Sequence, residues 1–357
     1  MPRKYSEIPH TKPCLGKAEA NAAAKVAASG HLACGKETAL FERELAKRFG
    51  IKNAVAVSSG TKALELALMA SGTAGGEVII PTYCCSALWH AAKAANAIPV
   101  LADCDPITLN PSPENVRAAL TKKTRAVILP NLFGLPCDPR KYKLPKGVTV
   151  ISDCAQASGA EIDGKFAGAY GDICTLSLYA TKLFTAGEGG VVLCGNKTVA
   201  DAVRDLREYD GVIPDHPRQN AKMTDMQSAI GRVQLGRLDG FLEKRLAAAR
   251  LYDRLLAGTG LLLPPDDEGR VYHRYVVQLA KPRAETVLKY LAARGIMARK
   301  PIFRPLHLDV PCKGRFPNTE AAYLRAISLP LFPQMTAAAI RQTVSAMQEA
   351  LKLIELK

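Results

Sequence analysis

Short apolar runs alternate with amphipathic segments along the first two thirds of the chain. Strands are predicted at 54–57, 77–81, 98–102, 125–130, 148–152, 173–178 and 190–194, and helices at 17–28, 39–46, 61–71, 86–95 and 113–120. Strands that alternate with helices form mostly parallel sheets covered on both faces. The pattern therefore predicts an α/β fold whose large domain is a three-layer αβα structure around a mostly parallel sheet.

The pattern changes after a long helical stretch at 224–256, which we expect to break near Gly240. A strand at 271–279, a helix at 283–294, a strand at 295–300 and a final helix at 336–353 follow. We interpret this part as a smaller C-terminal α+β domain. The predicted organisation is an N-terminal segment with the large domain over residues 1–240, and the small domain over residues 241–357.

The composition is that of a folded protein without membrane spans. The chain has 357 residues, of which 48% are hydrophobic and 23% charged, which excludes a disordered or fibrous protein. No apolar run approaches the roughly 18–20 residues that a membrane helix needs. Residues 1–13 are basic and polar, without the apolar stretch of a secretory signal. We therefore expect a cytoplasmic protein with no membrane partner.

Cysteines and net charge narrow the range of partners. The 10 Cys residues form no C-x-x-C pair, so we expect reduced thiols and no metal site. The excess of 48 Lys+Arg over 33 Asp+Glu gives a net charge of +15, which favours anionic small molecules. We expect no nucleic-acid partner, because the chain has no zinc finger, no aromatic-rich RNA-binding pattern and no basic tail.

Candidate chemistry follows three predicted strands, where parallel sheets bind their ligands. Ser59, Gly60 and Thr61 follow one strand and begin a helix, so they form either an anion site or a simple helix cap. Asp153 directly follows a buried strand, with Gln156 three residues further on. A carboxylate there needs a partner, which is a metal, a cationic ligand nitrogen or a helix N-terminus.

The third segment contains Lys182, between a strand that ends near Ser177 and a glycine-rich turn at 187–190. A partly desolvated lysine amine forms a Schiff base, whereas a solvated lysine has no such role. An anion seat, a carboxylate and a lysine at one sheet edge together fit pyridoxal 5'-phosphate (PLP). In this interpretation the seat and Ser177 hold the phosphate, Asp153 the pyridine nitrogen and Lys182 the aldehyde.

The sequence resembles the DegT/StrS-type sugar aminotransferases, a branch of the fold-type-I PLP enzymes. The resemblance covers about residues 30–350. It rests on the segments SSGTKALELAL (58–68), GGEVIIPTY (75–83), ISDCAQASGA (151–160), SLYATKLFTAGEGG (177–190), MTDMQSAIGRVQLGRLDGFLEKR (223–245) and ISLPLFPQMT (327–336).

The resemblance implies a role for each matching position. Lys182 matches the Schiff-base lysine, Asp153 the pyridine-nitrogen partner and Gln156 the residue near the ring hydroxyl. Gly60, Thr61 and Ser177 match phosphate binders. Asn220, in NAKM (220–223), matches an asparagine that reaches the phosphate in the neighbouring subunit, which implies a homodimer with shared active sites. Related dehydratases have histidine at the lysine position, so Lys182 favours transamination.

Several positions depart from the family pattern or have no firm role. Cys85 stands where an aromatic residue often stacks on the cofactor ring, which leaves Cys85, Tyr83 and Trp89 as candidates for that contact. Glu188 matches the acid of the GEGG loop. The candidates for substrate binding are His307 of PIFRPLH (301–307), which is otherwise a structural loop histidine, and the basic residues Arg299, Lys300 and Arg304, which otherwise form a solvated face.

The resemblance implies a PLP-dependent aminotransferase of amino-sugar biosynthesis. It moves an amino group from an amino acid, with glutamate as the expected donor, to a keto-sugar that is expected to be linked to a nucleotide. Two alternatives stay open. One is a non-catalytic PLP-binding regulator, and the other is cysteine desulfuration by the thiol of Cys312, which is flanked by Lys313.

Overall fold

A seven-stranded sheet forms the centre of the computed structural model, which describes residues 7–211 and 213–355. The strand order is β1-β9-β8-β5-β4-β2-β3, and every neighbouring pair is parallel except those of β9, which runs antiparallel to β1 and β8. The predicted mostly parallel α/β sheet is confirmed. Its strands are β1 (Asn53–Val57), β2 (Glu77–Pro81), β3 (Ile98–Ala102), β4 (Thr124–Pro130), β5 (Thr149–Asp153), β8 (Ile173–Ser177) and β9 (Gly190–Cys194).

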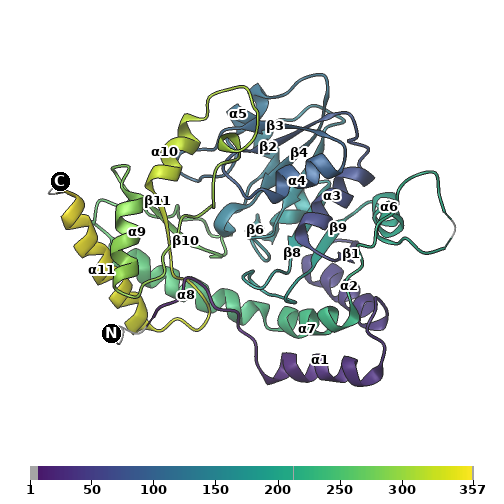
Figure 1. Cartoon of the computed structure of the whole chain (residues 1–357), viewed down its shortest axis with the longest axis horizontal. Coiled ribbons are helices and arrows are strands. Elements are labelled where there is room, and N and C mark those ends of the chain that lie inside the picture. The colour runs from purple at the N-terminus through teal and green to yellow at the C-terminus, as the bar shows by residue number, and fades with distance from the viewer. Residues whose placement is uncertain (1–6, 212, 356–357) are drawn as a thin grey trace.

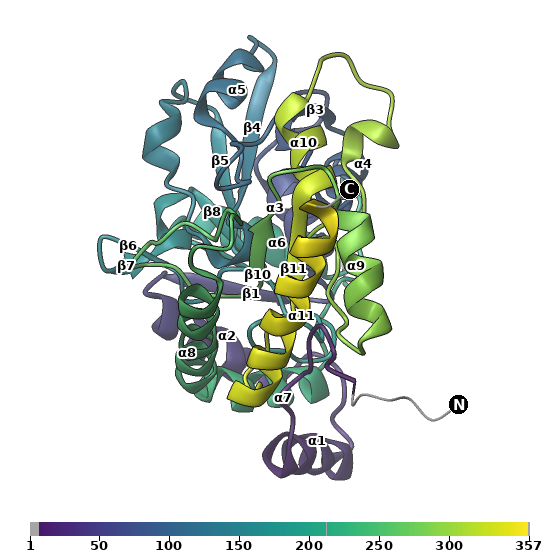
Figure 2. The same ribbon diagram turned by 90° about the vertical axis from the view of Figure 1, so that its left-hand side faces the viewer.

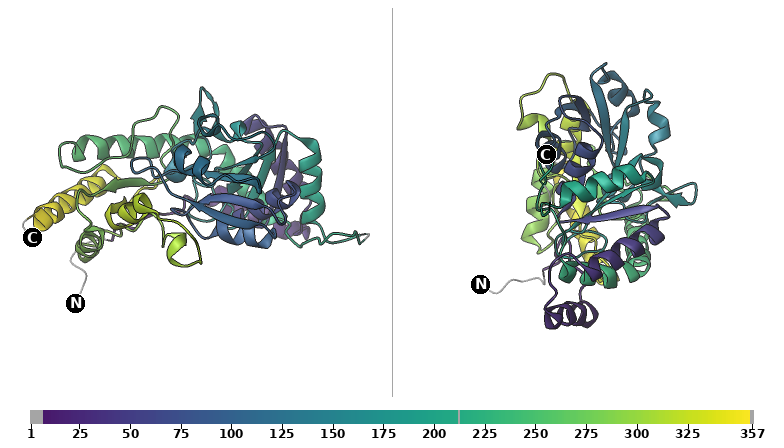
Figure 3. Two further views of the ribbon diagram at one scale, coloured as in Figure 1. Left: turned by 90° about the horizontal axis from the view of Figure 1, so that it is seen from above. Right: turned by 90° about the vertical axis from the view of Figure 1, so that its right-hand side faces the viewer.

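Helices cover both faces of this sheet, so the predicted three layers are present (Figures 1 and 3). Apolar side chains of α3 (Gly60–Ala70), α4 (Ala87–Ala94) and α6 (Lys197–Arg207) pack on one face. Apolar side chains of α2 (Lys36–Phe49) pack in a second cluster with residues of β1, β8 and β9. Those of α5 (Pro113–Ala118) pack in a third cluster with residues of β2, β3 and β4. Helix α1 (Lys17–Ser29) lies outside these layers against α7 (Asp225–Gly236), at the bottom of Figure 1.

The C-terminal part of the chain has a core of its own around two antiparallel strands (Figure 2). The N-terminal segment joins this core: Ile8 is buried in it, and its backbone bonds to Gly295 and Met297. The boundary between residues 240 and 241 stays a prediction. The elements here are α8 (Leu238–Leu256), β10 (Tyr275–Gln278), α9 (Ala284–Ala293), α10 (Pro317–Arg325), β11 (Ala326–Leu329) and α11 (Ala337–Glu355).

Some predicted boundaries are wrong. The helical stretch breaks at Arg237, between α7 and α8, whereas Gly240 lies inside α8. Residues 295–300 form no strand, since only isolated bridges join Ile296 to Ile8 and Arg299 to Ser328. The strand expected at 271–279 shortens to β10, because the backbone of residues 271–273 bonds to Phe133 and Gly134 instead.

The sequence pattern also missed α6, α10, β11 and several short elements. These are the hairpin β6 (Glu161–Ile162) and β7 (Lys165–Phe166), and the 3-10 turns η1 (Leu132–Gly134), η2 (Pro139–Tyr142), η3 (Ala167–Tyr170) and η4 (Leu306–Leu308). Within the described residues, no helix is both long enough and apolar enough to cross a membrane.

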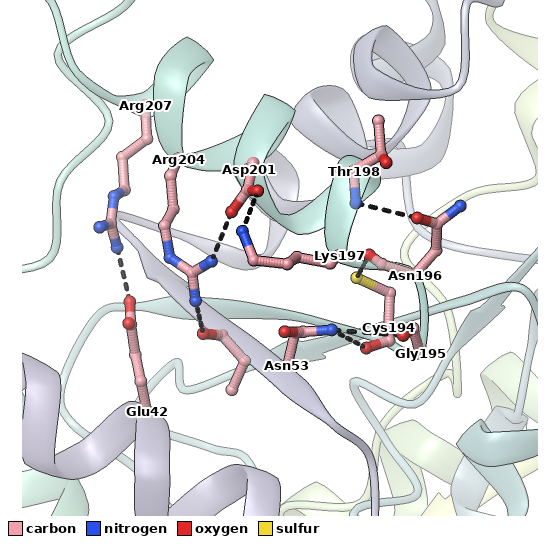
Figure 4. Close-up of polar contacts among 11 residues, drawn as sticks. Glu42, Asn53, Cys194, Gly195, Asn196, Lys197, Thr198, Asp201, Arg204 and Arg207 are labelled. Carbon is pink, nitrogen blue, oxygen red and sulfur yellow. Dashed lines mark hydrogen bonds and ion pairs between the residues drawn. The ribbon is translucent and has the colours of Figure 1, made fainter.

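Side chains occupy the outer edge of β1, the last strand on its side of the sheet (Figure 4). Glu42 accepts a hydrogen bond from the Ala56 amide at 2.8 Å. Arg207 pairs with Glu42 at 2.7 Å and donates to the Ala56 carbonyl at 2.6 Å. Arg204 donates to the Ala54 carbonyl at 3.2 Å. These contacts hold α2 and α6 against the strand and satisfy its outward backbone groups.

Candidate active site

The carboxyl ends of β1, β5 and β8 lie together at one edge of the sheet. Asp153 ends β5 and is opposite Thr175 of the parallel strand β8. Ser177 ends β8 opposite Gly190, which is in turn opposite Val57 at the end of β1. The sheet register therefore brings the three predicted segments to one place, as the rule for parallel sheets requires.

The start of α3, with Ser59, Gly60 and Thr61, approaches Ser177 at the end of β8, and these four residues are here called the anion cradle. Ser59 is the N-cap of α3, with its hydroxyl accepting from the Lys62 amide at 3.2 Å, so the capping role is real. A Cβ on Gly60 would lie 2.7 Å from Cβ of Ser177 and 3.0 Å from its Oγ, so the close approach requires glycine. The first amides of α3 have no intrahelical acceptor and can bind an anion there.

Lys182 lies in the loop between β8 and β9, and its side chain is partly buried. Desolvation lowers the pKa of its amine, while the nearby Cys85 and Asp153 act in the opposite direction and Arg274 lowers it further. Within residues 7–211 and 213–355 the amine has neither a hydrogen bond nor an ion pair. It is a desolvated amine that is available for chemistry.

Asp153 is almost completely buried, with 7% of its surface exposed. Desolvation raises the pKa of its carboxyl group, and the Ala155 amide at 3.0 Å and the charge of Lys182 partly offset this effect. The carboxylate and the amine each shift the pKa of the other, so the structure brings these two predicted residues together.

Gln156 is fixed by a residue that the sequence analysis missed. Its Oε1 accepts from the Phe133 amide at 3.0 Å and lies 3.2 Å from Nδ1 of His273. Nε2 of His273 lies 3.3 Å from the Thr181 carbonyl oxygen, next to Lys182. Burial and the charges of Lys182 and Arg274 lower the pKa of His273. A neutral imidazole carries a single N–H, so it donates to only one of these two oxygens. The one sequence signal was a histidine inside an apolar strand pattern.

The three candidates for a ring contact lie in different surroundings. Cys85 is exposed and lies within electrostatic range of Lys182 and Asp153. Tyr83 is completely buried in a separate cluster with Phe133, and its hydroxyl has no hydrogen-bond partner among the described residues. Trp89 packs against the core beneath α3 and α4.

Asn220 and Glu188 are both exposed. Asn220 lies in a segment that runs beside the end of β1, where the Ser58 amide donates to the Ala221 carbonyl. Neither side chain is joined to Lys182 by a hydrogen bond or ion pair in the described part of the chain.

The loop at 301–316 is fastened to the large sheet by His307. Nδ1 of His307 lies 2.8 Å from Oγ1 of Thr82, and its ring packs against Phe316. Arg304 is exposed and pairs with Asp309 at 2.7 Å. Cys312 is exposed in the same loop, while Lys300 donates to the Tyr323 carbonyl. These contacts agree with a structural role for His307, and its part in substrate binding stays a prediction.

The fold and the site together define a class of protein. An unpartnered lysine amine and a buried carboxylate, beside an anion cradle at the carboxyl edge of a mostly parallel αβα sheet, are the arrangement of an aminotransferase of PLP fold type I. No group of three or more metal-ligating side chains occurs in residues 7–211 and 213–355. The chain belongs to the DegT/DnrJ/EryC1/StrS aminotransferase family, a PLP-dependent family that matches residues 13–348.

Known relatives cover nearly the whole chain. The chain is 33% identical over 374 residues to dTDP-4-dehydro-2,3,6-trideoxy-D-glucose 4-aminotransferase of Saccharopolyspora spinosa, covering 96% of each chain. It is 32% identical over 313 residues to GDP-perosamine synthase of Escherichia coli O157:H7, covering 83% of this chain and 85% of the relative. The crystal structure of the aminotransferase TlmJ from Streptoalloteichus hindustanus superposes with a TM-score of 0.91 at 29% identity, over 98% of this chain and 100% of that one.

Proposed function

We propose that the chain binds PLP at this site and transfers an amino group from an amino acid to the keto group of a nucleotide-linked sugar. The observation that carries the proposal is the unpartnered, desolvated amine of Lys182 within electrostatic range of buried Asp153. The names of the two relatives above, which act on dTDP- and GDP-linked sugars, support the substrate class.

The residues present fit the cofactor. The anion cradle offers the first amides of α3 and the Ser177 hydroxyl to a phosphate, and glycine at position 60 lets the start of the helix approach Ser177 closely. Asp153 supplies a buried carboxylate for a cationic ring nitrogen, which would satisfy its unfavourable burial. Gln156, held by Phe133 and His273, is assigned to the ring hydroxyl. Cys85 is assigned to the ring face.

Lys182 has two tasks in this proposal. PLP, when bound, supplies an aldehyde and an electron-withdrawing ring. The lowered pKa of the Lys182 amine increases the neutral fraction that attacks a carbonyl carbon. Once the amine of the donor has replaced Lys182, the freed Lys182 amine could take a proton from the α-carbon of the donor and deliver it to the cofactor.

The oligomer and the location are part of the proposal. Exposed Asn220 is assigned to the cofactor phosphate of a second copy, which makes the functional unit a homodimer with shared sites. Glu188 and Arg304, both exposed, and His307 stay candidates for the sugar side of the site. The ten free cysteines fit a reducing, cytoplasmic location.

The experiment compares the PLP-loaded protein with Lys182→Ala, and with Lys244→Ala as a control on the exposed face of α8. The unaltered protein and the control are expected to show the absorbance of lysine-bound PLP. L-glutamate should remove that absorbance, and a keto-sugar nucleotide should restore it. Lys182→Ala should lose both the absorbance and turnover. Normal absorbance and turnover in Lys182→Ala, or no response of the unaltered protein to any amino acid, would contradict the proposal.

A further inference from the structure

A small cavity lies where helix α8 meets the N-terminal segment and the loop of Lys182, and it has no role in the function proposed above. Its volume is about 10 Å³, which is about the space that one water-sized sphere needs. The N-terminal segment, the Lys182 loop and helices α7 and α8 all contribute to its lining. It is here called the α8 cavity.

The lining of the α8 cavity contains cationic residues without an acidic counterpart. The three cationic residues are Lys12, Lys182 and Arg245. No Asp or Glu of residues 7–211 and 213–355 is part of the lining. The carboxylate of Glu19 accepts a hydrogen bond at 2.7 Å from Gln234, which lines the cavity, but its ion pair is with Arg237. The cavity is therefore an electropositive space.

Arg245 is the cationic residue that most needs a partner. It is only 2% exposed, and burial lowers the pKa of its guanidinium to about 10, so it still carries its charge at pH 7. Its Nη1 donates to the carbonyls of Tyr272, His273 and Leu331 at 3.1–3.3 Å. Among the described residues, neither its Nε nor its Nη2 has a hydrogen-bond partner. A buried charge with unused donors is unfavourable, so this edge of the guanidinium requires an acceptor.

The size of the α8 cavity limits what this acceptor can be. Carboxylate, phosphate and sulfate groups contain several heavy atoms and exceed a space of about 10 Å³. A monatomic anion such as chloride is only slightly larger than a water molecule and fits. The Nε–H and one Nη2–H of a planar guanidinium point in the same direction, so both can donate to a single ion. Water fits as well, but it brings no charge to offset that of Arg245.

We propose that the α8 cavity binds one chloride ion, which accepts from Nε and Nη2 of Arg245 and is attracted by the charge of Lys12. The ion balances the buried guanidinium and joins α8 to the N-terminal segment and the Lys182 loop. Arg245 also holds the carbonyl of His273, so the ion supports one wall of the candidate active site. This inference goes beyond the proposed amino transfer and does not depend on it.

The first experiment locates the ion in crystals of the PLP-loaded protein in which sodium bromide replaces sodium chloride. Bromide substitutes for chloride and is identified by its anomalous scattering. We expect an anomalous peak within hydrogen-bond distance of Nε and Nη2 of Arg245. A non-anomalous water at this position would overturn the proposal, and so would bromide found on the surface alone, as an adventitious ion only.

The second experiment measures binding in solution, with sodium chloride replacing sodium gluconate at constant ionic strength. Gluconate is too large for the cavity, so the rise of the thermal unfolding midpoint with chloride concentration gives a dissociation constant. Arg245→Met should lose this dependence. Lys12→Gln should raise the constant by about 3-fold, as expected for an exposed charge. Lys17→Gln, an exposed lysine at the start of α1, is the matched control and should leave it unchanged.

The solution results can also contradict the proposal. Equal midpoints of the unaltered protein in chloride and gluconate would overturn it, as would an undiminished chloride dependence in Arg245→Met. Because Arg245 is buried, its replacement can prevent folding, and the bromide crystals and Lys12→Gln then decide. Equal dissociation constants for Lys12→Gln and Lys17→Gln would contradict the assigned part of Lys12.

Discussion

The substitution Gly60→Ala tests the anion cradle directly. The new Cβ would lie 2.7 Å from Cβ of Ser177, whereas carbon atoms pack at about 3.5–4.0 Å. Ser177 is hydrogen-bonded into β8 between β5 and β9, so it has little freedom to move. The first turn of α3 must therefore shift by about 1 Å, which moves the Gly60 and Thr61 amides away from the position of a phosphate.

The size of the effect follows from these contacts. Overpacking of this kind costs about 1–3 kcal/mol in unfolding free energy. Loss of one hydrogen bond to a charged phosphate costs about 1.5–3 kcal/mol of binding, which is about 10- to 100-fold in the dissociation constant for PLP. Replacing Ser177 by Ala keeps the overlapping Cβ, so only Ser177→Gly should restore part of the stability of Gly60→Ala.

The assay is a PLP titration of the cofactor-free protein, together with urea unfolding. Gly240→Ala is the control, because this exposed glycine inside α8 has no atom within 4 Å of the new methyl group. It is expected to leave PLP binding unchanged and to add about 0.5–1 kcal/mol of stability. A dissociation constant for Gly60→Ala within threefold of the unaltered value would refute the assignment of the phosphate to the cradle.

Two further predictions concern stability. Burial, and then the charges of Arg274, Arg299 and Arg245, lower the pKa of His10 from 6.5 to about 3. The unfolded chain therefore takes up a proton that the folded chain does not, so stability falls as the pH drops from 6.5 towards 3, by about 2 kcal/mol at pH 5. Urea unfolding at pH 7 and pH 5 should show a smaller loss in His10→Gln, and an equal loss in both proteins would contradict the assignment. The Asp225 carboxylate caps the start of α2, where it accepts hydrogen bonds from three amides and one hydroxyl. Asp225→Ala should therefore lower the free energy of unfolding, measured by calorimetry, by about 3 kcal/mol or more, and Asp225→Asn by less. A loss below about 0.5 kcal/mol would show that this cap is dispensable.

The sheet and the core of the site could be predicted because their signals are local. Each central strand is a short apolar run, and the rule that parallel strands end at one edge brings Asp153, Ser177 and Gly60 together without any knowledge of loop geometry. Lys182 follows the same rule, because its loop leaves the edge at which β8 ends. These positions depend on chain direction and side-chain period alone.

The rest of the site depends on packing between distant segments. His273 and Arg274 reach Lys182 because residues 271–273 bond to the backbone of Phe133 and Gly134 rather than extending β10. No pattern in either segment predicts this pairing. The break expected near Gly240 is present, but it falls at Arg237, between α7 and α8, because an exposed glycine is tolerated inside a helix.

The occupied edge of β1 also bears on how this protein behaves at high concentration. An unprotected edge strand is a template on which a strand of another molecule can add, which leads to aggregation. A foreign strand at β1 would have to displace Glu42, Arg204 and Arg207 from the backbone of Ala54 and Ala56. Replacing these side chains would therefore expose the strand to edge-to-edge association with another molecule.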